Sequence, residues 1–141
     1  MEIVEVKTKK QFKEFLNFPR FIYQDKYPKY VSPLHAHLQL MIGKIGAPDK
    51  HLLMAIENGQ VVARCGFKVH KHGKETTLNF GFFECREGHK DAVKKIFQHA
   101  HSLHPDLAIR GPFQFRMEDP YIGVLVDGFE HDPYFLMTYN P

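Results

Sequence analysis

The chain of 141 residues has no tryptophan, two cysteines and no long apolar run. A membrane span requires about 20 consecutive apolar residues, so the sequence predicts none. Cys65 and Cys85 are too few for a disulfide framework, and both fall in predicted strands, where a cysteine usually serves as a small buried apolar residue. Residues 1–5 lack the basic flank and apolar core of a signal peptide. We therefore expect a reduced, cytoplasmic protein.

The sequence also lacks a block of charge of one sign. The formal net charge is +3, and the lysines are spread from Lys7 to Lys95. Nucleic-acid-binding domains concentrate their basic residues, so we expect no nucleic-acid partner. Residues 20–30 mix aromatic and basic side chains, which indicates either a surface that stacks on bases or, preferably, a packed connecting loop.

Ten histidines occur without the spacing of a metal site. Residues 35–37 and 99–101 each place two histidines two positions apart on a predicted helix, about 200° around its axis, so neither pair shares a metal. The histidines of residues 70–72 lie on an extended segment and could face the same way. No Cys-x-x-Cys or His-Glu-x-x-His motif supports them, and we predict no metal.

The clearest pattern that is present is a strand, a helix and a second strand between residues 78 and 115. Alternating apolar residues predict a strand over 78–84. Apolar residues at helical spacing predict a helix over 88–104, which Pro105 ends before the next strand at 107–109. Such a unit usually forms a parallel pair with a right-handed crossover. The loop before the helix then favours a phosphate-bearing ligand.

The N-terminal third predicts a short strand and two helices. Residues 3–6 form the strand. Thr8 and Gln11 have the spacing of a capping box for a first helix, which Pro19 ends. Residues 32–33, a serine followed by proline, predict the start of a second helix.

Three antiparallel strands are predicted before the crossover, followed at the C-terminal end by a short helix and a final strand. The three strands are residues 52–56, 61–69 and 75–85, and the last is residues 134–139. The dipeptide Asn58-Gly59 is a strong hairpin signal, and a second turn is predicted over 70–74. The fold class is therefore α+β with a mixed sheet: an antiparallel meander, then a parallel β-α-β crossover, in one domain over residues 1–141.

Five motifs spread over most of the chain carry a resemblance to a known family. They are Phe18-Pro19 with Tyr23 and Pro28, Asn79-Phe80-Gly81-Phe82-Phe83-Glu84, Arg110-Gly111-Pro112, Val126-Asp127-Gly128-Phe129, and Met137-Thr138-Tyr139-Asn140-Pro141. With this order of elements the chain resembles the GCN5-related N-acetyltransferase (GNAT) superfamily, which has the acyl-CoA N-acyltransferase fold, without its last strand. The closer resemblance is to a bacterial branch of acetyltransferase-like hypothetical proteins. It implies transfer of an acetyl or other acyl group to an unknown small-molecule or peptide amine.

The resemblance also implies a cofactor site for acetyl-CoA or another acyl-CoA. In the superfamily, the loop after the fourth strand follows the pattern Arg/Gln-x-x-Gly-x-Gly/Ala and binds the pyrophosphate with backbone N–H groups, which small residues allow to approach. Here Gly88 matches the first glycine, while Cys85 and Lys90 stand at the other two positions. The implied cofactor-binding residues are Phe82, Phe83, Arg86, Gly88, His89, Lys90 and Asp91.

Glu84 and Tyr121 are the catalytic residues that the resemblance implies. The superfamily polarises the thioester carbonyl with a backbone N–H where two strands separate, here around residues 82–84. A carboxylate on that strand commonly serves as base, and burial among Phe80, Phe82 and Phe113 would raise the pKa of Glu84. The alternative is a glutamate that ends a strand in solvent. A tyrosine commonly protonates the thiolate; Tyr121 fits best and Tyr139 second, and the alternative for each is a structural tyrosine.

Two further expectations concern partners and an alternative function. The chain ends at Pro141, just after its last strand signal, so we expect either a piece of a longer protein or a partner chain that completes the sheet. An unpaired edge at 134–139 favours a homodimer or strand exchange. The loop over 85–91 keeps one of three motif positions, which leaves a second hypothesis: a non-catalytic binding or interaction module with the GNAT fold.

Overall fold

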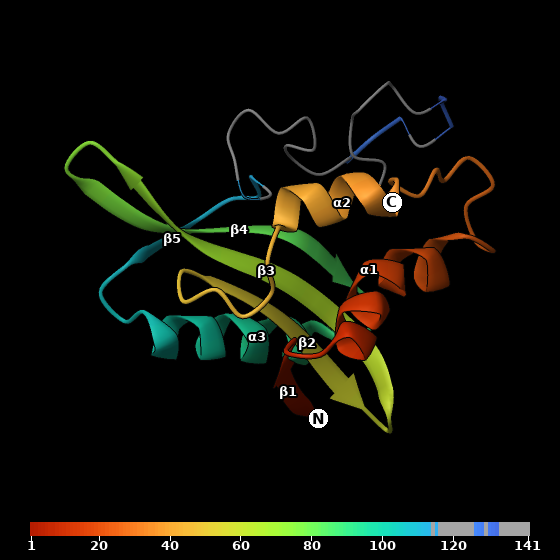
Figure 1. Cartoon of the computed structure of the whole chain (residues 1–141). Helices are drawn as coiled ribbons and strands as arrows, with labels where there is room; N and C mark the ends of the chain where they lie inside the picture. The colour runs from red at the N-terminus through yellow and green to blue at the C-terminus, as the bar shows by residue number, and fades with distance from the viewer. Residues whose placement is uncertain (114, 116–125, 129, 133–141) are drawn as a thin grey trace.

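The computed structural model describes residues 1–113, 115, 126–128 and 130–132 (Figure 1). Within them the elements are β1 (Glu2–Glu5), α1 (Lys9–Tyr23), α2 (His35–Ile42), β2 (Lys50–Glu57), β3 (Gln60–His72), β4 (Glu75–Cys85), α3 (Lys90–Leu103) and β5 (Ala108–Arg110). Tyr121, Tyr139, the predicted short helix after residue 119 and the strand over 134–139 lie outside the described residues. No helix in the described ranges combines the length and apolarity needed to cross a membrane.

Within the described residues, five strands form one mixed sheet in the order β1-β2-β3-β4-β5. Strands β1 to β4 pair antiparallel, and β4 pairs parallel with β5, which places Leu78 opposite Ile109. Helix α3 forms the crossover on one face of the sheet, and α1 and α2 lie on the other (Figure 1). The predicted meander followed by a parallel crossover is confirmed.

Each face of the sheet buries its own apolar core. On the α3 side the core includes Leu53, Phe67, Leu78, Ala92 and Ile96. On the α1 and α2 side it includes Phe15, Leu38, Met54, Phe82 and Phe115. The sheet is therefore covered on both faces, and polar side chains inside it need partners.

The predicted hairpin is confirmed, and the second turn is shorter than predicted. Asn58 and Gly59 have φ of 51° and 76°, the backbone of a two-residue turn that suits strand twist. Strand β3 continues to His72, so Gly73, with φ of 59°, and Lys74 alone connect it to β4.

Helix α1 continues through Pro19, so the prediction that it ends there is wrong. Proline has no N–H to donate to the carbonyl four residues earlier, which belongs to Phe15. Arg64 on β3 supplies the missing donor: its Nη1 lies 2.5 Å from the Phe15 oxygen. Its guanidinium also lies 4.9 Å from the centre of the Phe15 ring. The capping box of Thr8 and Gln11 is confirmed.

Helix α2 begins later than predicted. Its N-cap residue is Leu34, without a side-chain hydrogen bond, so Ser32 does not cap the helix. The predicted end at Gly43 is confirmed, with φ of 66°.

Candidate functional site

A β-bulge in β4 decides which way the predicted site residues point. The β3–β4 register passes from the Arg64–Glu84 pair to the Gly66–Gly81 pair, so two residues of β4 oppose one of β3. One of the two, Phe82, has φ of 51°, which is uncommon for a bulky residue. A Cβ on Gly66 would lie 3.0 Å from the Phe82 ring, so this glycine makes room for the bulge.

The bulge reverses the alternation of side chains, so Glu84 is buried as predicted and shares a face with Phe82 but not with Phe80. The Phe80 ring packs on the α3 side, 5.0 Å from that of Phe97. Phe82 packs on the opposite face, 4.9 Å from the ring of Phe115, and Glu84 follows it to that face. Glu84 is 9% exposed. The alternative of a strand end in solvent is therefore wrong.

Glu84 belongs to a polar cluster under α1, which we call the buried cluster and define as Tyr23, Arg64 and Glu84. The Tyr23 hydroxyl donates a hydrogen bond to Glu84 Oε2. Arg64 Nη2 lies 3.9 Å from Glu84 Oε1. The ring of Tyr23 also packs against that of Tyr30, with centroids 5.0 Å apart. Both carboxylate oxygens thus have a partner.

Burial governs the acid–base properties of this cluster. It raises the pKa of Glu84 above its usual value, although Arg64 and the bond from Tyr23 oppose the rise. Burial and then the charge of Glu84 raise the pKa of Tyr23, and the same two causes raise that of Tyr30 to about 12. A carboxylate with a raised pKa suits a proton acceptor near neutral pH.

The loop after β4 leads to the N-terminus of α3, where several amides are free. His89 is the N-cap residue and makes no side-chain cap. The amides of Arg86 and His89 donate to backbone carbonyls. In the part of the chain that the structure describes, the amides of Gly88, Lys90 and Asp91 have no hydrogen-bond partner. These N–H groups lie at the positive end of the helix dipole.

Acidic side chains surround the same loop. Asp91 lies in the first turn of α3. Glu57 Oε2 lies 3.5 Å from the Nε2 atom of His89. Glu87 Oε2 lies 3.0 Å from the Nζ atom of Lys26, which follows α1. An anion at this helix start would therefore meet free amides and also nearby carboxylates.

The structure does not bring all the predicted cofactor residues together. Gly88, His89, Lys90 and Asp91 gather at the start of α3, as predicted. Phe83 lies in the bulge with its ring 6.4 Å from that of Phe97, on the far side of the sheet from Glu84. Phe82 is part of the core, and Arg86 lines a groove described next.

A groove of about 480 Å³ separates the end of α1 from the loop after β4. It is lined by Phe21, Ile22, Tyr23, Lys26 and Tyr27 on one side and by Cys85, Arg86 and Glu87 on the other. Tyr23 belongs to both the groove and the buried cluster, so it connects the groove to Glu84.

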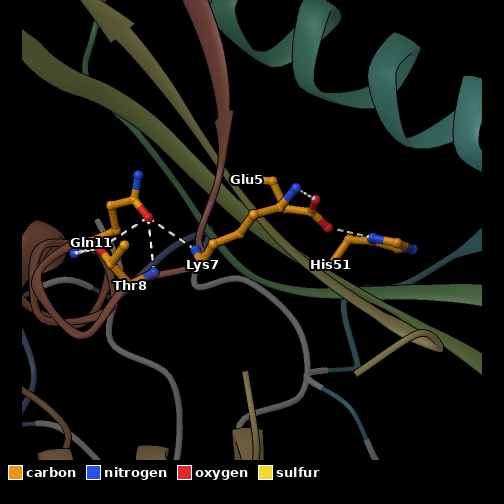
Figure 2. Close-up of polar contacts among 5 residues, drawn as sticks. All are labelled: Glu5, Lys7, Thr8, Gln11 and His51. Atoms are coloured by element: carbon orange, nitrogen blue, oxygen red, sulfur yellow. Dashed lines mark hydrogen bonds and ion pairs between the residues drawn. The ribbon is translucent and has the colours of Figure 1, made fainter. Parts of the chain in front are cut away.

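A second polar cluster lies at the β1 edge of the sheet; we call Glu5, His51 and His104 the edge cluster. Glu5 Oε1 lies 2.7 Å from His51 Nδ1 (Figure 2), and His51 Nε2 lies 3.0 Å from His104 Nε2. Burial would raise the pKa of Glu5, but bonds from His51 and Lys7 lower it. Burial, then the neighbouring His51, lower the pKa of His104. Among the described residues, no group of three or more candidate ligands could hold a metal.

Sequence reasoning missed Tyr23, Arg64 and the pair His51–His104. One signal pointed to Arg64: it is the charged residue inside the apolar stretch 61–67, where a cation requires a buried partner. Arg64 and Phe15 are 49 residues apart in sequence, and His51 and His104 are 53 apart. Tyr23 and Glu84 are 61 apart, so no local spacing reveals these contacts.

Comparison with known proteins gives matches in structure and none in sequence. No protein-family model and no curated protein matches the chain. An aminoglycoside acetyltransferase from an uncultured soil metagenomic sample has a TM-score of 0.56 at 10% identity, over 84% of this chain and 80% of that one. The aminoglycoside antibiotic 6'-N-acetyltransferase of Acinetobacter haemolyticus gives 0.54 at 15% identity, over 79% and 80%. Escherichia coli ElaA has a TM-score of 0.50 at 16% identity, over 77% of this chain and 75% of that one.

These likenesses concern the path of the backbone, because the identities are too low to carry an activity. Two of the three matched proteins are acetyltransferases by name. The meander, the parallel crossover through α3 and the placement of α1 and α2 on the opposite face account for the match. The chain has the acyl-CoA N-acyltransferase fold of the GNAT superfamily.

Proposed function

We propose that this protein is an acyl-CoA-dependent N-acyltransferase that transfers an acetyl or other acyl group to an amine. The end of β4 carries this proposal. This strand carries the buried Glu84 and then leads to the free amides before α3. A buried carboxylate and, within about ten residues of it, a helix start that can bind an anion suit transfer from a phosphate-bearing thioester.

The start of α3 fits the pyrophosphate of an acyl-CoA. Gly88 has φ of 84° and nothing within 4 Å of the position of a Cβ, so its backbone is open to approach. The amides of Gly88, Lys90 and Asp91 would donate to the phosphates, and Lys90 would add a positive charge. Glu87 and Asp91 would reduce the affinity. When bound, acetyl-CoA would supply the thioester that donates the acyl group.

Within this proposal, Glu84 accepts the proton of the attacking amine through Tyr23. Tyr23 lines the groove and its hydroxyl donates a hydrogen bond to Glu84, so the hydroxyl would take one proton from the amine as it passes its own proton to the carboxylate. Arg64 keeps the carboxylate in place and limits the rise in its pKa. Tyr121, the predicted proton donor to the thiolate, stays a prediction outside the described residues.

Thermal unfolding with acetyl-CoA tests the proposal. A ligand that binds only the folded state stabilises it by about 2.7 kcal/mol at 100 times its Kd, so the melting temperature should rise. No shift at millimolar acetyl-CoA would remove the enzyme hypothesis. Coenzyme A release with a panel of amines, including an aminoglycoside because two fold neighbours bear that name, then measures turnover.

The Glu84→Gln variant separates binding from chemistry. Glutamine has nearly the same size and can still accept the Tyr23 hydrogen bond, so the shift with acetyl-CoA should persist. Turnover should fall by about 100-fold or more, because the proton acceptor is lost. A Glu14→Gln variant serves as control, since Glu14 is exposed on α1 and lies outside both the buried cluster and the groove.

A non-catalytic binding module is the second candidate, and the full engagement of Glu84 favours it. Both carboxylate oxygens have partners, and a buried ion pair can be retained for structural reasons alone. This candidate predicts a thermal shift with acetyl-CoA or another ligand, no release of coenzyme A with any amine, and an effect of Glu84→Gln on stability only.

A further inference from the structure

We propose that the acceptor amine also carries an anionic group, a carboxylate or a phosphate, which Arg86 binds in the groove beside Tyr23. The inference rests on the proposed acyl transfer and narrows its acceptor to one chemical class. It is carried by the position of the groove, by an unpaired nitrogen of Arg86 and by the charges of the groove lining.

The groove adjoins the place where acyl transfer is proposed. Tyr23 lines it and bonds directly to Glu84, and Cys85, Arg86 and Glu87 continue the chain from that residue. Arg86 follows Glu84 by two positions and lines the groove together with Tyr23. An acceptor whose amine reaches Tyr23 can therefore place a second group at Arg86.

Arg86 lines this groove and has a side-chain hydrogen-bond donor without a partner among the described residues. Its Nε is shielded from solvent and has no hydrogen-bond partner in the described part of the chain. A buried donor without an acceptor destabilises the folded state, so such groups usually meet a ligand or a bound water. Guanidinium binds carboxylates and phosphates with two parallel hydrogen bonds, which Nε and one Nη can form together.

The remaining charges of the groove leave Arg86 as the group that selects an acceptor. Among the described lining residues, the charged ones are Lys26, Arg86 and Glu87. Lys26 and Glu87 lie 3.0 Å apart and offset each other's charge. The lining therefore has a surplus positive charge, which favours an acceptor with an anionic group over a polycationic amine.

Aromatic side chains supply the apolar part of the same surface. Phe21 is 74% exposed although it is large and apolar. Tyr27 also lines the groove, and Lys26 Nζ lies 5.6 Å from the centre of its ring. Ligand sites commonly combine such apolar area with a few polar anchors. An acceptor with an amine, an apolar side chain and a terminal anion, such as a dipeptide, has all three features.

The test compares two probes that differ by one charge. Glycyl-phenylalanine and its C-terminal amide are titrated calorimetrically into the protein saturated with coenzyme A, and into the free protein. We expect the dipeptide to bind about tenfold more tightly than the amide, the effect of one charge-assisted hydrogen bond. Phosphoethanolamine and ethanolamine form a second pair; a preference in this pair alone would identify phosphate as the anion.

Variants assign the preference to Arg86. Arg86→Gln should bring the dipeptide and its amide within about twofold of each other, and Arg86→Glu should reverse their order. Lys94→Gln, which removes the same charge from an exposed position on α3, should leave the preference intact. The thermal shift with acetyl-CoA should stay within error in Arg86→Gln.

Three outcomes would overturn the inference. They are equal binding within both probe pairs, no binding of any of these probes at millimolar concentration, and loss of the acetyl-CoA shift in Arg86→Gln with the dipeptide preference retained. The last would assign Arg86 to the donor site. If acetyl-CoA fails to bind the unmodified protein, the proposed function fails, and the titrations of the free protein still decide whether the groove prefers anions.

Discussion

The buried cluster and the edge cluster each join a carboxylate to hydrogen-bond donors, yet the two carboxylates shift their pKa in opposite directions. Glu84 is 9% exposed, and burial raises its pKa against the influence of Arg64 and Tyr23. The side chain of Glu5 is 29% exposed, and bonds from its neighbours lower its pKa against the influence of burial. The hydrogen-bond partners of the two carboxylates are similar in kind, so the degree of burial decides whether the pKa rises or falls.

This difference separates a group suited to accept protons from one that stays ionised. A carboxylate near the surface keeps its charge at neutral pH and contributes a weak, solvent-screened interaction. One enclosed on a covered face of a sheet holds its proton to higher pH and depends on its partners for any charge it carries. We therefore expect substitutions in the buried cluster to reduce the free energy of unfolding strongly, and substitutions in the edge cluster to reduce it little.

The largest effect is expected for Arg64→Met. The substitution leaves the Phe15 carbonyl without its donor and Glu84 without its cation, both in a buried environment. The free energy of unfolding, measured by urea denaturation, should fall by about 3–5 kcal/mol. The double variant with Glu84→Gln should recover part of the loss, because no uncompensated charge remains. A loss below about 1 kcal/mol would show that the pair is not buried in solution.

A smaller loss is expected for Tyr23→Phe. The change removes only the hydroxyl that donates to Glu84, so the acceptor loses one bond while the ring packing against Tyr30 stays. Unfolding should require about 1–3 kcal/mol less free energy. The matched control is Tyr27→Phe, whose ring contacts that of Tyr23 without reaching Glu84, and it should change stability by less than about 0.5 kcal/mol.

The two clusters should give opposite slopes of stability against pH. Glu84 keeps its proton to higher pH when folded, so its contribution falls as pH rises from its usual 4.5 to its higher folded pKa. His104 binds a proton less readily when folded, so its contribution falls as pH drops from its usual 6.5 to its lower folded pKa. Each group can change the slope of the free energy of unfolding against pH by up to about 1.4 kcal/mol per pH unit.

Denaturation at several pH values checks these slopes. Glu84→Gln should remove the loss that accompanies rising pH, and His104→Asn should remove the loss that accompanies falling pH. If both variants changed the pH dependence of stability in the same way, the predicted opposite behaviour of the two clusters would be wrong.

The mildest effect is expected for Glu5→Gln. Glutamine can still accept from His51, and the contact with Lys7, 3.2 Å at a well-exposed lysine, is screened by water. Stability at pH 7 and physiological salt should fall by about 1 kcal/mol or less, and Lys7→Ala should have a still smaller effect. A loss comparable to that of Arg64→Met would mean that exposure does not distinguish the clusters.

Local sequence patterns predicted the scaffold, while contacts between distant segments determined the site. The hairpin at Asn58-Gly59 and the crossover through α3 follow from turn chemistry and periodicity within short windows, and both are confirmed. The extension of α1 through Pro19 could not be predicted, because its replacement donor lies 49 residues away on β3. The bulge at Phe82 depends on the register with β3, and a single extra residue moved Glu84 to the other face of the sheet.

The guanidinium of Arg64 has a consequence for how the protein could respond to a ligand. One rigid planar group holds the backbone of α1 at Phe15 and faces the carboxylate of Glu84. A ligand that pushes the end of α1 aside would draw this cation with the helix and so alter the acidity of Glu84. Binding of a ligand beside α1 and the proton affinity of Glu84 would then change together, through the side chain of Arg64.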